Sequence, residues 1–371
     1  MNLFFYLKTK KIKKTLVKTL VLSLATSSLF LLAPLPKVEA NFDLGTLFGI
    51  GVYYSKLNSE LSYLDNDGRH EYMEQIKKKY GVNKDVRANA MLEDIMTRLT
   101  NSIAKEDKTI LDKPYNYFVN NDKSFNAFCT LGHNLSVNIG TFETLNYNED
   151  ELAFVIAHEM VHGQKGDPIN GVKKQIPLSV LSTIFVSNNG NYATALGAQL
   201  LVNLGTAKGI TLPMELTADE YSFDYAVGAH YNPGAGAAIW QRIMEKYGSK
   251  KNNFVSTFIN PSDHPTHIKR RDKFCLAMKA YSKDNVDVDP ETGYILLKGK
   301  KAFKPASLAS RSSLERAYLL AGELATAYHY EKYYGKVTAR LVGNTIYLRN
   351  KAFMTVMPDD NANLIINAIN N

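Results

Sequence analysis

The chain has 371 residues, of which 45% are hydrophobic and 22% charged, and its net charge is +8. This composition excludes a disordered chain and is sufficient for two or three domains with a large core. Residues 1–40 hold seven lysines and one glutamate, so most of the net charge belongs to the N-terminal segment. The remainder has no basic stripe with interleaved aromatic residues, which argues against a nucleic-acid partner.

The first 40 residues have the pattern of a secretory signal peptide. Lysines crowd positions 8–18, an apolar run covers residues 20–33, and residues 38–40 (V-E-A) offer a cleavage site before Asn41. A retained membrane anchor is the alternative, but the run is short for a span of about 20 residues. We therefore expect export to the periplasm or cell envelope, as a soluble protein or one associated with a membrane surface.

Residues 41–112 predict helices, because apolar residues recur at the spacing of a helix packed on one face, most clearly in residues 87–104. Residues 114–119 then predict a strand. Residues 127–139 predict a strand pair that turns at residues 132–134.

Two apolar stretches, residues 176–186 and 192–210, follow later in the chain. They predict buried helices or an amphipathic lid, and neither is suited to span a bilayer. The two cysteines, Cys129 and Cys275, could form a disulfide after export, but the sequence does not decide whether they meet.

The stretch that ends at His162 carries an H-E-x-x-H motif. In a helix with 3.6 residues per turn, His158 and His162 lie one turn apart on the same face, where both imidazoles can bind one metal ion. Glu159 would then lie beside the ion, where a carboxylate can act as general base on a water molecule.

Helix signals surround this motif. Asn148 is a suitable N-cap, the next three residues are acidic, and Gly163 is a suitable stop. The alternative is a chance motif on a surface helix. Apolar residues on nearly all sides predict a buried helix instead, and two buried histidines and a carboxylate are costly unless they are paired or bound to a metal.

A zinc site that keeps one position open for water needs a third protein ligand. The metzincin pattern would supply a histidine six residues after the motif, where this chain has Pro168. A later helix offers Glu215 and Asp219 on one face, so the first could bind zinc and the second could accept the other N–H of a ligand histidine. A solvated acidic helix face is the alternative.

These segments together resemble metallopeptidase family M48, the gluzincin-type group that includes HtpX-like proteases, CAAX prenyl proteases and BepA-like and LoiP-like enzymes. Further elements of that pattern are N-A-F…G…V…G in residues 126–140, A-H-Y-N-P in residues 229–233, and His264-Pro-Thr followed by Arg270. The resemblance covers roughly residues 60–280, and several elements in the family's order are more specific than any single one.

The resemblance implies a zinc-dependent endopeptidase with one zinc ion per chain. It implies that His158, His162 and Glu215 are the metal ligands, that Glu159 is the general base, and that Asp219 is a hydrogen-bond partner of a ligand, His158 being the one we expect.

Further roles follow from the same resemblance. We expect His264 to steady the oxyanion of the tetrahedral intermediate, with Arg270 as the second candidate. The cleft strand should hold an extended substrate by strand addition, which gives broad specificity because main-chain hydrogen bonds ignore side chains. The residues expected to contact substrate on that strand are Leu135, Ser136, Val137, Asn138 and Ile139. Four departures from the family pattern leave the subfamily and the substrate open: His133, Asp167, His230 and Asn232.

The C-terminal part begins after an acidic linker at residues 284–290. Residues 291–371 predict a small α+β module in which residues 312–330 form the main helix and residues 337–348 form a hairpin. A last strand, residues 353–357, and a short helix would complete the module. It carries no catalytic cluster, and substrate recruitment, partner binding and simple stabilisation all remain open as its role.

The expected fold class is α+β. A mostly helical catalytic domain with a short cleft-lining sheet would cover residues 41–283, and the small module would cover residues 291–371. The expected function is hydrolysis of extended or misfolded envelope polypeptides. A catalytically weak chaperone-like or binding protein on the same fold is the main alternative, and an inert structural protein with a chance motif is the third. The oligomeric state stays open.

Overall fold

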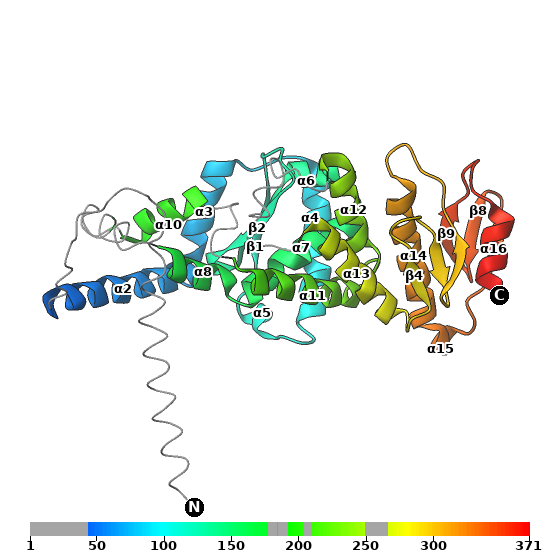
Figure 1. Cartoon of the computed structure of the whole chain (residues 1–371). Helices are drawn as coiled ribbons and strands as arrows, with labels where there is room; N and C mark the ends of the chain where they lie inside the picture. Colours follow the sequence, from blue (N-terminus) through cyan, green and yellow to red (C-terminus); the bar gives the residue numbers. More distant parts are fainter. Residues whose placement is uncertain (1–43, 177–183, 185–191, 204–209, 249–265) are drawn as a thin grey trace, which may run out of the picture. The chain divides into compact units, whose positions relative to one another are not determined.

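The computed structural model describes residues 44–176, 184, 192–203, 210–248 and 266–371 (Figure 1). Contacts divide the chain into two units, Met1–Gly49 and Ile50–Asn371, and the elements below belong to the second unit except for the start of α2. The elements up to α8 are α2 (Leu44–Asp65), α3 (Arg69–Tyr80), α4 (Val86–Ile103), α5 (Thr109–Asp112), β1 (Asn116–Asn120), β2 (Ala127–Thr130), the 3-10 turn η1 (Leu131–His133), β3 (Asn134–Asn138), α6 (Ile139–Thr144), α7 (Glu149–Gln164) and α8 (Asp167–Gln175).

Helices dominate the middle of the chain, and two small sheets follow. The helices are α10 (Tyr192–Asn203), α11 (Leu212–Gly228), α12 (Ala235–Tyr247) and α13 (His267–Tyr281). The C-terminal elements are β4 (Val286–Val288), β5 (Ile295–Leu297), β6 (Lys300–Phe303), α14 (Ser313–His329), α15 (Glu331–Tyr334), β7 (Ala339–Val342), β8 (Thr345–Leu348), β9 (Lys351–Thr355) and α16 (Ala362–Asn370). Helices with small sheets confirm the expected α+β class.

The first sheet has the strand order β1-β3-β2, with β3 parallel to β1 and antiparallel to β2. The predicted turn between β2 and β3 is present, and Gly132 and His133 adopt positive φ angles of 77° and 52° there. An L residue at such a φ is uncommon, and histidine is one of the residue types that tolerate it best. The strand pair is therefore where the sequence predicted it, with β3 in the middle of the sheet.

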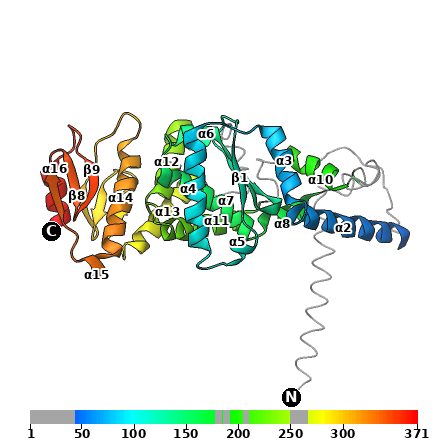
Figure 2. The same cartoon turned by 180° about the vertical axis from the view of Figure 1, so that it is seen from behind.

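Helix α7 carries the H-E-x-x-H motif and lies at the centre of this part of the molecule. Its start is capped as predicted, because the side chain of Asn148 accepts a hydrogen bond from the backbone N–H of Glu151. The helix ends at Gln164, one residue past the predicted stop at Gly163. Helices α11 and α12 pack against one part of its surface, and α4 covers it on the side seen in Figure 2. Every residue from Glu151 to Gly163 is buried.

Two hydrophobic clusters hold the described residues together. The larger one runs from Ala88 in α4 through α7, α11, α12 and α13 into the C-terminal sheets and ends at Ile369 in α16. The smaller one joins α2, α3 and α10 to Phe128 in β2 and Leu131 in η1. Because burial of apolar surface is the main driving force of folding, the C-terminal elements and the helices around α7 stabilise each other through one continuous core.

The structure differs from the sequence-based expectation at the predicted linker. Residues 284–290 contain β4, in which Val286 and Val288 are buried and Asp287 lies between them with a partly exposed side chain. The alternation of apolar and acidic residues is typical of a half-buried strand. The high proportion of acidic residues led to the prediction of a linker instead. The last strand, β9, spans Lys351–Thr355 and so starts two residues earlier than predicted.

Other expectations concern membranes, thiols and the apolar stretches. None of the helices in the described ranges combines the length and the apolar character that a bilayer span requires. Cys129 and Cys275 are both free thiols. Of the apolar stretches, α10 accounts for residues 192–203, whereas residues 177–183, 185–191 and 204–209 lie outside the described residues.

Candidate metal centre

Three buried side chains from two helices converge at one point. His158 and His162 come from α7 and Glu215 comes from α11, and one ligand atom of each lies within 4.8 Å of the others. The Nε2 atoms of the two histidines are 3.2 Å apart. Glu215 Oε2 lies 3.5 Å from Nε2 of His158, and Glu215 Oε1 lies 3.6 Å from Nε2 of His162. One cation between these atoms could contact all three residues.

Local structure explains this convergence. The two histidines are four residues apart on α7, so the helix repeat presents both imidazoles on one face. Helix α11 starts after Thr211, has Pro213 in its first turn, and packs along α7. Glu215 lies in that first turn, and Asp219 follows one turn later on the same face. The pairing of the two helices therefore brings both acidic residues to the histidines.

A carboxylate orients the ring of His158. Asp219 Oδ1 lies 3.2 Å from Nδ1 of His158. Burial by itself would raise the pKa of Asp219, but the neighbouring guanidinium of Arg270 and the hydrogen bond with His158 outweigh it, so this pKa lies below its ordinary value. An ionised Asp219 that accepts the Nδ1 proton leaves Nε2 of His158 with its lone pair directed at the candidate metal position.

A second carboxylate does the same for His162. Asp167 Oδ2 lies 2.8 Å from Nδ1 of His162, and Gly166 turns the chain between the two residues with a φ of 65°. From the sequence, Asp167 is only a departure from the family pattern and has no assigned role. Its position five residues after the motif was the one available signal, and a turn after a helix cannot be built from spacing alone.

The arrangement favours a positive charge at its centre. Burial by itself would lower the pKa values of both histidines, but hydrogen bonds to Asp167 and Glu215 raise that of His162 to about 10, and those to Asp219 and Glu215 raise that of His158. Two imidazole nitrogens and a carboxylate oxygen are also a donor set that zinc prefers, and three protein ligands leave a fourth position open. The residues present therefore fit a catalytic zinc ion.

Glu159 faces strand β2 from the motif helix. The backbone N–H of Cys129 donates a hydrogen bond to Glu159 Oε2 over 2.9 Å. Burial raises the pKa of Glu159 above its ordinary value, although both neighbouring histidines oppose this. A carboxylate with a raised pKa next to a metal position is suited to accept and return a proton.

Arg270, the second candidate for the oxyanion, is buried behind the ligands. Its Nε donates to both carboxylate oxygens of Asp219 at 3.1 and 2.9 Å, and its Nη2 lies 3.2 Å from Nδ1 of His158. Its guanidinium also lies 3.9 Å from the ring centroid of Trp240. These contacts bind Arg270 to Asp219, the carboxylate partner of His158. The first candidate, His264, lies outside the described residues.

The strand expected to contact substrate, β3, does not lie at an edge of the sheet. Strand β3 contains Leu135, Ser136, Val137 and Asn138, is buried along its whole length, and pairs with β1 on one edge and β2 on the other, so no added strand can pair with it. Ile139 is not in the strand at all but begins α6. The sheet edge that contacts α7 belongs to β2. The resemblance that suggested β3 rests on residues 126–140, which include both β2 and β3, and it does not specify which of the two lies at the edge of the sheet.

Comparisons with known proteins agree with this site. The model of peptidase family M48 matches residues 87–274, which is about half of the chain and includes all the described residues of the candidate centre. A protein of Vibrio cholerae serotype O1 (strain ATCC 39315 / El Tor Inaba N16961), provisionally named a beta-barrel assembly-enhancing protease, is 25% identical over 241 residues. That match covers 62% of this chain and 46% of the relative, so the chain matches less than half of the relative's length. The extent of the family match, with the motif histidines and Glu215 inside it, shows that this chain belongs to peptidase family M48, a family of metallopeptidases.

Proposed function

We propose that this protein is a zinc-dependent endopeptidase in which His158, His162 and Glu215 bind one zinc ion per chain. The observation that carries the proposal is the meeting of these three buried side chains from two distant segments. Zinc bound there would act as a Lewis acid that lowers the pKa of a water molecule to about 7 and polarises the scissile carbonyl group.

The chain's own residues have separate roles in this mechanism. Glu159 accepts a proton from the attacking water and returns it to the nitrogen of the leaving amine, so no net proton is gained or lost. Asp219 and Asp167 hold the Nδ1 protons of the two histidines and keep both rings oriented. His264 remains our candidate for contact with the oxyanion.

Strand β2 is the candidate substrate-binding edge. The N–H of Cys129 points away from β3 and toward Glu159, and because backbone groups alternate along a strand, the N–H and C=O of Ala127 face the same way. An extended peptide that pairs with this edge would lie beside the general base. Main-chain pairing tolerates many side chains, so we expect broad specificity for unfolded segments.

We propose that the protein is exported and degrades misfolded polypeptides of the cell envelope, either free or associated with a membrane surface. The lysine-rich and apolar pattern of residues 1–40 supports export, and the name of the Vibrio cholerae relative supports a role in the envelope.

The first test removes the proposed base without changing the size of the side chain. Glu159→Gln should cleave casein or an unfolded outer-membrane protein about 10²- to 10⁴-fold more slowly than the unmodified chain, because the amide cannot accept the proton. Zinc content should be unchanged, since Glu159 is not a ligand. Equal cleavage by the two proteins would reject the peptidase and leave the chaperone-like or binding alternative.

A further inference from the structure

The first turn of helix α7 is tethered by three consecutive acidic side chains. Glu149 Oε1 accepts a hydrogen bond from Nη1 of Arg98 in α4 over 2.6 Å. Asp150 Oδ1 accepts the backbone N–H of Asn232 over 2.9 Å. The third residue, Glu151, is completely buried and contacts arginines from two other segments. Negative charge at a helix N-terminus is favourable in any protein, but here each carboxylate also fixes the helix to a different neighbour.

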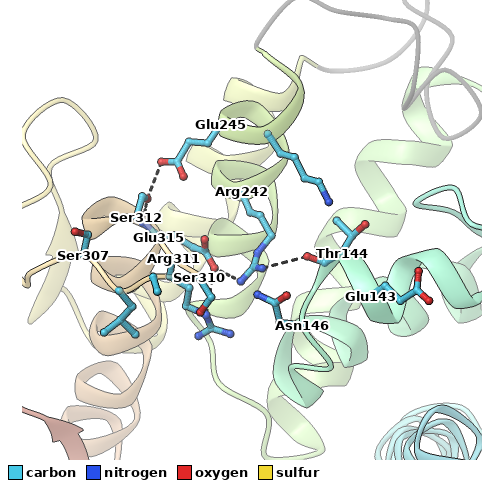
Figure 3. Close-up of a pocket in the computed structure, with 13 residues that line it drawn as sticks. Glu143, Thr144, Asn146, Arg242, Glu245, Ser307, Ser310, Arg311, Ser312 and Glu315 are labelled. Carbon is cyan, nitrogen blue, oxygen red and sulfur yellow. Dashed lines mark hydrogen bonds and ion pairs between the residues drawn. The ribbon is translucent and has the colours of Figure 1, made fainter.

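Glu151 belongs to a cluster of two carboxylates and two guanidinium groups, all of them buried except Arg311, whose side chain is 17% exposed. Arg311 Nη2 lies 2.9 Å from Glu151 Oε2, and Arg242 Nη2 lies 3.5 Å from the same oxygen. Both arginines also contact Glu315 in the first turn of α14. Figure 3 shows Arg242 directed at Glu315 and at the carbonyl oxygen of Thr144, with Arg311 beside them. A pocket of about 550 Å³ opens next to this ionic cluster.

A second connection joins α14 to the same turn of α7. Asn232 donates from its side-chain amide to the carbonyl oxygen of Leu319 in α14 over 2.9 Å, while its backbone N–H bonds Asp150. The contact is tight, because a Cβ added to Gly322 would lie 2.3 Å from the backbone nitrogen of Gly234. Only glycine allows α14 this close to the turn before α12.

The ionic cluster is a poor way to raise the free energy of unfolding. Burial raises the pKa of Glu151 to about 7 although both arginines oppose it, and burial also raises the pKa of Glu315. Buried ion pairs of this kind often stabilise a protein no more than well-packed apolar residues would. Such a cluster can instead fix the positions of the segments that it joins relative to one another. Glu151 lies seven residues, or two turns, before the ligand His158 on the same face of a single helix.

We propose that the C-terminal segment, residues 291–371, is a positioning part of the active site. It holds the start of α7 in place through Arg311, which pairs with Glu151, and through Glu315, which pairs with both Arg311 and Arg242. These contacts thereby set where His158 and the general base lie relative to α11. The inference rests on the proposed function, because the geometry it protects is that of a hydrolytic metal centre. It assigns a role to a segment in which the sequence shows no catalytic cluster.

The experiment compares two arginines five residues apart in the full-length chain. Arg311→Met removes the contact with α7. Arg316→Met removes an arginine whose side chain is 7% exposed, against 17% for Arg311. Among the described residues, Arg316 bonds Asp360 and the backbone carbonyls of residues 306 and 355, all within the C-terminal segment. Arg311→Lys restores the charge without the forked guanidinium. We would measure kcat and KM on casein, zinc affinity by competition with a chelator, and Tm.

A displacement of the reacting groups should lower kcat in Arg311→Met by about 10-fold or more, with KM nearly unchanged. Zinc affinity should fall as well, and Arg311→Lys should recover part of both. Arg316→Met should lose Tm but keep kcat and zinc affinity at temperatures where it is folded. Equal effects of the two methionine variants, or no effect of Arg311→Met, would overturn the inference. If the unmodified chain binds zinc but cleaves nothing, the proposed function fails, and zinc affinity still decides the positioning role.

Discussion

Arg270 is the side chain that connects the carboxylates of the candidate centre to its surroundings. It bonds Asp219 with two nitrogens, approaches Glu215 Oε2 to 3.7 Å, and lies against the face of Trp240. The indole ring in turn stacks on His267, with 5.2 Å between ring centroids. A cation held between a carboxylate and an aromatic face is both paired and well packed, which explains why a guanidinium can be buried here.

Replacement of this arginine tests its role at the residue scale. Arg270→Lys keeps the charge but loses the forked geometry, so Asp219 and the ring of His158 should become less well oriented. We expect zinc affinity to fall by about 10- to 100-fold, as is usual when the partner of a ligand is altered. Competition with a fluorescent chelator measures this. The matched control is Arg271→Lys, because Arg271 bonds Gln241 and Asp272 instead. Unchanged zinc affinity in Arg270→Lys would contradict the role.

At the scale of elements, α7 is a buried helix whose ends and sides are all in contact with protein. Its surface touches β2, α4, α11 and α12, and its first turn is tied by three carboxylates. A helix enclosed in this way cannot shift without disturbing several neighbours at once. The cost is that Glu151 is completely buried, so ionisation of its carboxyl group is unfavourable and its pKa is raised.

This cost predicts a pH dependence of stability. The folded-state pKa of Glu151 is raised from 4.5 to about 7, so the folded chain retains a proton that the unfolded chain releases. The stabilisation from that proton is present below pH 4.5 and is lost as the pH rises to about 7. The charged groups that face this carboxyl are Arg242, Arg311, Glu315 and Asp150.

The variant Glu151→Gln has no titrating group at this position. As the pH rises from 4.5 to about 7, the free energy of unfolding of the unmodified chain should therefore fall relative to that of the variant. Urea unfolding at several pH values between 5 and 8 measures the difference. Glu143→Gln serves as the control, because Glu143 is an exposed carboxylate at the same pocket. A constant difference between Glu151→Gln and the unmodified chain would show that Glu151 is charged throughout the range.

At the scale of the whole molecule, one core extends from α4 to α16, so anything that binds the folded centre stabilises all of these elements together. Zinc at 100 times its dissociation constant should raise the free energy of unfolding by about 2.7 kcal/mol. Calorimetry after chelation and after return of zinc measures this as a shift of Tm. Glu215→Gln should show a much smaller shift. An equal shift in that variant would mean that zinc binds elsewhere.

Much of the candidate site could be predicted because its information is local. The spacing of His158 and His162 requires only a helix, and Asn148 and the acidic residues after it define where that helix starts. Glu215 could not be assigned as a ligand from its own segment, because nothing there distinguishes a metal ligand from a solvent-exposed acidic residue. Its assignment came from a family pattern that links two segments more than fifty residues apart.

Tertiary structure alone decided the remaining features. The order of strands placed β3 in the middle and gave β2 the edge beside Glu159, and strand order depends on pairings between distant residues that hydrophobicity does not encode. The contact of Asp167 with His162 required a left-handed turn at Gly166. The meeting of Arg311 with the start of α7 joins segments 160 residues apart, and no local pattern contains it. Helices and their caps follow from neighbouring residues, whereas contacts between elements exist only once the chain has packed.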